Sequence, residues 1–155
     1  MIAFPIGPSG RDLVFVDEVL AHFERYQQVR WWQREAGGQL FARVNNGRIE
    51  IVEATGPRPT DRRSRTSYNP DKRAEQQEID TRFPLGLHFV GDWHTHPEDQ
   101  PKPSLIDVQS TADSVRRSRH SLHAFALVIV GRGPFPEALH VSVHDGKALY
   151  FLVAR

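Results

Sequence analysis

The residues of this chain best suited to chemistry lie in one short block. His94 and His96 are separated by one residue, and such a pair points to the same face when it lies on a β-strand. The proline-rich segment 97–103 then ends the strand, and Ser104 is placed to cap a helix whose first turn contains Asp107. Two imidazoles and one carboxylate are suitable zinc ligands, and they leave a fourth tetrahedral position for water. The spacing therefore predicts one catalytic Zn²⁺ per chain.

A hydrolytic zinc site also needs a base that is not itself a metal ligand. Glu35 is the candidate, because it shortly precedes Gly37 and Gly38, where missing side chains let the backbone approach a neighbouring segment closely. Ser104 carries a hydroxyl that can donate a hydrogen bond to a developing oxyanion. Glu35 and Ser104 are therefore the predicted catalytic residues.

Each of these features also has a simpler explanation. Two histidines on a strand are often ordinary polar residues, and Ser104 with Asp107 forms a common helix-capping pattern. The complete spacing from His94 to Asp107 nevertheless favours a metal site. The remaining histidines lack such spacing and are interpreted as surface or core residues: His22, His88, His120, His123, His140 and His144.

A basic segment, 58–73, contains six basic residues against two acidic ones. It is either a solvated loop or a site for a carboxylate-bearing C-terminal peptide, which arginine binds through paired hydrogen bonds. Nucleic-acid binding is not expected, because Tyr68 is its only aromatic residue and a stacking platform needs several. The candidate substrate-binding residues are Arg62, Arg63 and Arg65.

Helices and strands that would position these residues can be read from hydrophobic spacing and turn signals. Apolar residues at helical spacing predict a first helix over 16–26, and Asn45-Asn46-Gly47 predicts a hairpin turn. Segment 55–70 lacks a hydrophobic period and is predicted to be an exposed loop. A helix capped by Asn69, with Pro70 at its first position, is expected to follow and to end before Pro84. The predicted strands are 35–44, 48–54, 87–96, 124–131, 138–144 and 148–154, and a third helix is predicted over 104–120.

Composition limits the class of protein. The chain has 155 residues, of which 39% are hydrophobic and 25% charged, and this suits one domain over residues 1–155. The element order predicts a mixed α/β (α+β) fold with a central, mostly antiparallel sheet and about three helices. A formal net charge of +1 argues against a polyelectrolyte binder, and the absence of Cys excludes a thiol nucleophile and thiolate ligands. With no long apolar run and no signal peptide, we expect a cytoplasmic protein that does not enter a membrane.

Two motifs together resemble a known family. The segment EAGGQLF at 35–41, followed by HTHP at 94–97, five residues, Pro-Ser, two residues and Asp, resembles the JAMM signature of the JAB/MPN metalloproteases. The resemblance implies an MPN fold with a curved sheet. It also implies that the glutamate polarises water, that the two histidines and the aspartate bind zinc, and that the serine stabilises the tetrahedral intermediate. The matching residues are Glu35, His94, His96, Asp107 and Ser104.

A narrower resemblance concerns segments 55–80 and 86–104. They are similar to small bacterial JAB proteins encoded with E1- and E2-like proteins, notably in CBASS antiphage operons. This implies hydrolysis after the C-terminus of a conjugated protein, in CBASS the nucleotide synthase (CD-NTase), which frees the target lysine. Trimming of a ubiquitin-like or sulfur-carrier protein, a non-catalytic MPN scaffold, and metal-dependent cleavage of another bond stay open as alternatives.

Overall fold

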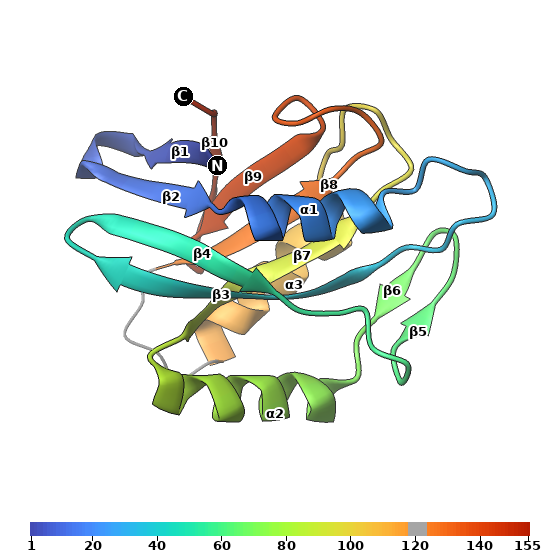
Figure 1. The fold of residues 1–155 in the computed structure, drawn as a ribbon, viewed down its shortest axis with the longest axis horizontal. Coiled ribbons are helices and arrows are strands. Elements are labelled where there is room, and N and C mark those ends of the chain that lie inside the picture. Colours follow the sequence, from blue (N-terminus) through green and yellow to red (C-terminus); the bar gives the residue numbers. More distant parts are fainter. Residues whose placement is uncertain (118–123) are drawn as a thin grey trace.

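The computed structural model describes residues 1–117 and 124–155, which form a curved sheet with helices on both sides (Figure 1). Among these residues no helix is both long enough and apolar enough to cross a bilayer. The strands are β1 (Ile2–Ile6), β2 (Arg11–Phe15), β3 (Gly37–Asn45), β4 (Arg48–Ala54), β5 (Arg62–Arg63), β6 (Tyr68–Asn69), β7 (His88–Thr95), β8 (Phe125–Val130), β9 (Leu139–His144) and β10 (Leu149–Leu152). The helices are α1 (Asp17–Tyr26), α2 (Lys72–Arg82) and α3 (Leu105–Arg117), with short 3₁₀ turns η1 (Gly7–Ser9) and η2 (Phe83–Leu85).

Eight strands form the main sheet in the order β1-β2-β4-β3-β7-β8-β9-β10, while β5 and β6 pair separately. The pairs β2/β4 and β7/β8 are parallel and the other five neighbouring pairs of this sheet are antiparallel. Strands β1 and β10 stand at opposite ends of this order and still contact each other, so the sheet curls strongly. The predicted mixed α/β fold with a mostly antiparallel sheet is confirmed.

One face of the sheet is covered by α1, which crosses in front of it in Figure 1. The helix buries Val19, Leu20 and Phe23, the positions that helical spacing predicts. The Phe23 ring lies 5.1 Å from that of Trp93 on β7, so aromatic packing joins helix to sheet. This core fixes which way β7 faces.

The alternation of side chains along β7 determines which face of the sheet carries His94. Because Trp93 points toward α1, its neighbour His94 points to the opposite face, where α3 packs against β8 and β9. Register pairs His94 with Gly37 on one side and Ile129 on the other. The central strand thus presents its histidine toward the helix that carries Asp107.

Two predicted turns are confirmed, two strands were not predicted, and the predicted cap of one helix needs correction. Asn46 and Gly47 both have positive φ in the β3/β4 turn, and Gly146 has positive φ between β9 and β10. Strands β1 and β2 were not predicted, since Pro5 and the Gly7–Ser9 turn interrupt the pattern. The cap of α2 is Asp71, not Asn69 with Pro70 as first helical residue.

The reason for the shifted cap is that the Asp71 carboxylate accepts hydrogen bonds from two free N–H groups of the first turn. Helix α3 runs over Leu105–Arg117, and the predicted extension over 118–120 lies outside the described residues. His120 and His123 lie outside them as well.

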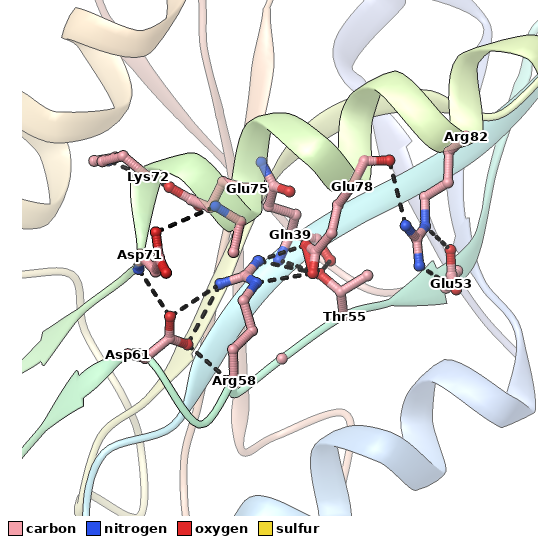
Figure 2. A network of polar contacts seen from close by, with 12 residues as sticks. Gln39, Glu53, Thr55, Arg58, Asp61, Asp71, Lys72, Glu75, Glu78 and Arg82 are labelled. Atoms are coloured by element: carbon pink, nitrogen blue, oxygen red, sulfur yellow. Dashed lines mark hydrogen bonds and ion pairs between the residues drawn. The ribbon is translucent and has the colours of Figure 1, made fainter.

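Segment 55–70 is only in part the exposed loop that its composition predicts. It contains strands β5 and β6, and its Arg58 and Asp61 side chains are only 9% and 0% exposed. Arg58 makes a two-pronged contact with Glu78 of α2 and also faces Asp61 (Figure 2). We call Thr55, Arg58, Asp61, Tyr68 and Glu78 the Arg58 cluster. It fastens residues 61–69, called the β5/β6 insertion below, to α2 and to the end of β4.

Candidate metal centre

Three side chains converge on the α3 face of the sheet. The Nε2 atoms of His94 and His96 are 3.1 Å apart, and they lie 3.2 Å and 3.4 Å from the Asp107 carboxylate oxygens. Tetrahedral zinc with bonds of about 2.0–2.1 Å places its ligand atoms about 3.3 Å apart. These donors, called the donor cluster below, therefore fit zinc in spacing and in chemical type. Among the described residues they are the only three His, Cys, Asp or Glu side chains that gather in this way.

The donor cluster is accessible from one side. Each of its side chains is 12–15% exposed, so an ion held there can still be reached by water and substrate. Burial alone would raise the pKa of Asp107, but contacts with His94 and His96 outweigh it and hold that pKa well below its usual range. The carboxylate is thus ionised, as a metal ligand must be.

Asp107 is held in place by the start of α3. The Ser104 N–H donates to its carboxylate at 2.7 Å, and the Asp107 N–H donates to Ser104 Oγ at 3.1 Å. The same aspartate thus takes part in a reciprocal cap and lies beside both histidines, so the capping pattern is compatible in geometry with a metal site. Since Ser104 Oγ accepts a bond there, its own hydrogen is left to donate elsewhere.

Glu98 is a site residue that the spacing analysis missed. Its carboxylate lies 2.7 Å from His96 Nδ1, the ring nitrogen that faces away from the donor cluster. Such a bond sets the imidazole tautomer and aims Nε2 at the metal position. Contacts from Asp107 and Glu98 raise the pKa of His96 despite the opposing effect of burial. The only sequence signal is an acidic residue two positions after the second histidine.

Glu35 lies beside the donor cluster and is 7% exposed. Burial raises the pKa of its carboxyl, while the charges of His94 and His96 act in the opposite direction, so the group lies within electrostatic reach of both rings. Its backbone is bonded on both sides to the β5/β6 insertion: its N–H donates to the Ser64 carbonyl at 2.7 Å, and its carbonyl accepts from Arg63 Nε at 2.6 Å.

The glycines after Glu35 permit this close approach, as predicted. A Cβ on Gly37 would lie 2.6 Å from the Trp93 carbonyl, and one on Gly38 would lie 1.8 Å from the Thr55 carbonyl. Neither space admits a side chain, because both neighbours are backbone atoms. Gly37 therefore lets this segment lie directly against β7, and Gly38 lets it lie against the residue that follows β4.

The three predicted substrate-binding arginines have different surroundings. Arg62 is exposed, and Arg65 is exposed with its guanidinium 5.5 Å from the ring centre of Trp31. Arg63 is half-buried and holds the Glu35 backbone. The insertion thus has one arginine that supports Glu35 and two that face solvent.

His140 also lies near the donor cluster. It follows Ile129 in the ladder that starts at His94, and it contacts Ser142 Oγ at 2.9 Å. Burial lowers its pKa to about 4, and the positive charge of His96 acts in the same direction. The ring is therefore neutral at pH 7, as expected for a satisfied core histidine.

Comparison with known proteins now assigns the class. Residues 17–142 match the family described as prokaryotic homologues of the JAB domain, a span that contains all five predicted catalytic and metal-binding residues. The chain belongs to this family and is a JAMM-type hydrolase.

Individual proteins similar to this chain include two relatives by sequence and one solved structure. A protein of Escherichia coli (strain TW11681) named CD-NTase/cGAS isopeptidase is 30% identical over 123 residues, which cover 77% of this chain and 76% of the relative. A probable metalloprotease, y4qB, of Sinorhizobium fredii is 24% identical over 127 residues, covering 79% and 77%. The solution structure of protein DSY2949 from Desulfitobacterium hafniense shares the fold, with a TM-score of 0.65, 14% identity, and coverage of 90% of this chain and 88% of that one.

Proposed function

We propose that this protein is a zinc-dependent isopeptidase that cleaves after the C-terminus of a conjugated CD-NTase-type protein and releases the target lysine. The observation that carries the proposal is the placement of three zinc-compatible donors beside a buried glutamate that is not among them. The names of its 30%-identical relatives support the choice of conjugate. The proposed setting is the cytoplasm, with E1- and E2-like proteins that make the conjugate.

His94, His96 and Asp107 would hold the ion, which when bound acts as a Lewis acid toward water and the scissile carbonyl. Glu35 accepts a proton from the attacking water as the new C–O bond forms. It then delivers that proton to the lysine Nζ as the C–N isopeptide bond breaks. Ser104 donates its hydroxyl hydrogen to the carbonyl oxygen while negative charge develops there. The products are a carboxylic acid, which ionises to the carboxylate, and a neutral amine, which takes up a proton in water.

The environment of Glu35 suits both halves of this cycle. A base must be ionised to accept the first proton, and an acid must be strong enough to protonate the leaving amine. Burial raises the pKa of Glu35 toward the working pH, so one residue can change between the two states in each turnover. Its fixed backbone keeps the carboxylate near the reacting atoms.

We assign the substrate's C-terminal segment to the surface formed by Arg62 and Arg65. Both arginines are exposed and, within the described part of the chain, neither has a carboxylate within ion-pair distance. They lie on the same insertion that holds Glu35, so a conjugated C-terminal segment whose acidic side chains bound there would lead toward the metal centre. Arg63 supports catalysis indirectly, because its guanidinium donates a hydrogen bond to the Glu35 carbonyl.

The test compares cells that carry the native operon with either the wild-type chain or Glu35→Ala, using mass spectrometry to search for lysine-linked adducts. Adducts that accumulate only with Glu35→Ala support the proposal and identify the conjugated protein. Glu24→Ala, an exposed glutamate of α1, is the control and should behave as wild type. Equal adduct levels in all three strains contradict isopeptide cleavage, whereas an accumulating unprocessed precursor indicates C-terminal trimming.

A further inference from the structure

Gln28 is a buried amide just after α1, 3% exposed, to which neither the motif nor the proposed mechanism gives a role. Its Oε1 accepts the hydroxyl hydrogen of Thr95 at 2.8 Å. Its Nε2 donates to the carbonyls of Gln33 at 3.2 Å and Arg65 at 3.1 Å. One side chain thereby connects β7, the segment before Glu35 and the β5/β6 insertion.

The direction of this amide is determined by its partners. Two carbonyls can only accept, so they require the NH₂ group, and both of its hydrogens are used. The Thr95 hydroxyl already accepts from the Ala36 N–H at 2.9 Å, so its own hydrogen points to Oε1. A reversed amide would bring oxygen against two carbonyl oxygens. The hydrogens and the oxygen of the Gln28 side-chain amide are therefore all satisfied in one orientation only.

Thr95 links Gln28 to the segment that bears Glu35 through hydrogen bonds. It is fully buried between His94 and His96, and its side chain points away from the donor cluster. Its N–H donates to the Ala36 carbonyl at 2.8 Å, and its hydroxyl accepts the Ala36 N–H. The residue after the glutamate is thus fastened to the residue between the two histidines.

We propose that Gln28 is a positioning residue that sets the distance between Glu35 and the donor cluster. Through Thr95 it braces the Ala36 side of the glutamate, and through the Arg65 carbonyl it braces the insertion that bonds to the Glu35 backbone. Its role in catalysis rests on the proposed function, but its role in holding the Glu35 segment does not.

The neighbouring Gln27 provides a matched control. It is half-buried, and its Nε2 also donates to two carbonyls, those of Gly131 at 2.9 Å and Gly133 at 2.8 Å. Those carbonyls belong to the segment after β8, not to the Glu35 segment. Gln27→Met and Gln28→Met therefore remove the same kind of contact from adjacent positions with different partners.

The first measurement is amide hydrogen exchange in the full chain. Gln28→Met should speed exchange of the Glu35 and Ala36 amides by about 10-fold or more, because local opening no longer has to break the Gln28 contacts. Gln27→Met should leave both amides unchanged. If Gln28→Met fails to fold, Gln28→Asn keeps the amide on a shorter stem and should give the same result. Unchanged exchange in the folded Gln28 variant overturns the inference.

The second measurement is kinetic and uses a CD-NTase joined through its C-terminus to a reporter protein. Gln28→Met should lower kcat about 10- to 100-fold with KM and zinc content unchanged, since misplacing a catalytic group by about 1 Å has that effect. In a Glu35→Ala background the same change should alter the residual rate less than about twofold. An equal effect in both backgrounds overturns the kinetic role. If wild type and Glu35→Ala both leave the fusion intact, the proposed function fails and the exchange result still decides the positioning role.

Discussion

Two charged clusters lie close to the same central strands, and they differ in whether their charges are satisfied within the protein. In the Arg58 cluster, one guanidinium faces the carboxylates of Glu78 and Asp61 (Figure 2). Asp61 also accepts hydrogen bonds from the Tyr68 hydroxyl and from two backbone N–H groups. In the donor cluster, two imidazoles and a carboxylate direct their free atoms toward one point. The first is satisfied by its own side chains and backbone, whereas the second has the spacing and chemistry to bind a cation.

The difference separates a structural charge cluster from a functional one. Burial alone would lower the pKa of Arg58, yet its bonds to Glu78 raise it, so the charged state is stabilised by the protein itself. The donor cluster can satisfy its electron pairs only by taking up protons or a metal ion. We therefore expect changes in the Arg58 cluster to reduce stability, and changes around the donor cluster to reduce metal affinity and activity.

The largest stability effect should come from Asp61→Ala. The change removes one of the two carboxylates that face Arg58, and it leaves the Tyr68 hydroxyl and two backbone N–H groups without their acceptor. Removing one member of a buried charge pair costs about 3–5 kcal/mol. Chemical denaturation of the metal-free protein measures the free energy of unfolding. Zinc bound per folded chain should stay unchanged, because Asp61 is not in the donor cluster.

Asp99→Ala is the matched control for that change. Asp99 forms an ion pair with Arg132, but its side chain is 78% exposed, so we expect a loss below about 1 kcal/mol. If the two variants lose similar stability, the Arg58 cluster is not the structural support inferred here. If Asp61→Ala loses zinc while still folded, the division between the two clusters is wrong.

A smaller effect, confined to the donor cluster, should follow Glu98→Ala. Without the contact at Nδ1 the His96 ring is free to turn, and loss of such a partner weakens metal affinity about 10- to 100-fold. Competition with a zinc chelator measures the affinity, and Glu24→Ala serves as the control. Because the Glu98 side chain is 47% exposed, the stability of the metal-free protein should hardly change. An unaltered zinc affinity would show that the ring is oriented by its other neighbours.

The convergence of the three donor-cluster side chains was predictable because its geometry is local. His94 and His96 share a strand face, and Asp107 lies one short turn away, so strand alternation and helix capping bring all three together. Glu35 is nearly sixty residues earlier, and its assignment depended on the resemblance to the JAMM signature and on Gly37-Gly38. The close backbone packing at these glycines confirms that part of the reasoning.

The Arg58 cluster and the Gln28 contacts were not predictable in the same way. Arg58 and Glu78 are twenty residues apart and meet only because α2 folds back over β3 and β7. An arginine-rich segment therefore appeared as a solvated loop or a binding surface, although Arg58 is buried and Arg63 supports Glu35. Composition gives the number of charged residues, but only tertiary packing shows whether a charged side chain forms an ion pair within the protein.

The smallest expected effect concerns His140, which tests whether the sheet beside the donor cluster tolerates positive charge without a metal. Its pKa is lowered to about 4 by burial and by His96, so neutral His140 contributes stability that is present above about pH 6.5 and is lost as pH falls toward 4. His140→Gln removes this titration. Between pH 7 and 4.5 metal-free wild type should therefore lose about 1–2 kcal/mol more unfolding free energy than the variant, after allowance for screening at a partly exposed ring. Denaturation curves at the two pH values measure the difference, and equal losses would mean that His140 accepts a proton in the folded protein as readily as in water. A larger loss of unfolding free energy in the wild type would show that burial next to the donor cluster disfavours a positive charge on His140.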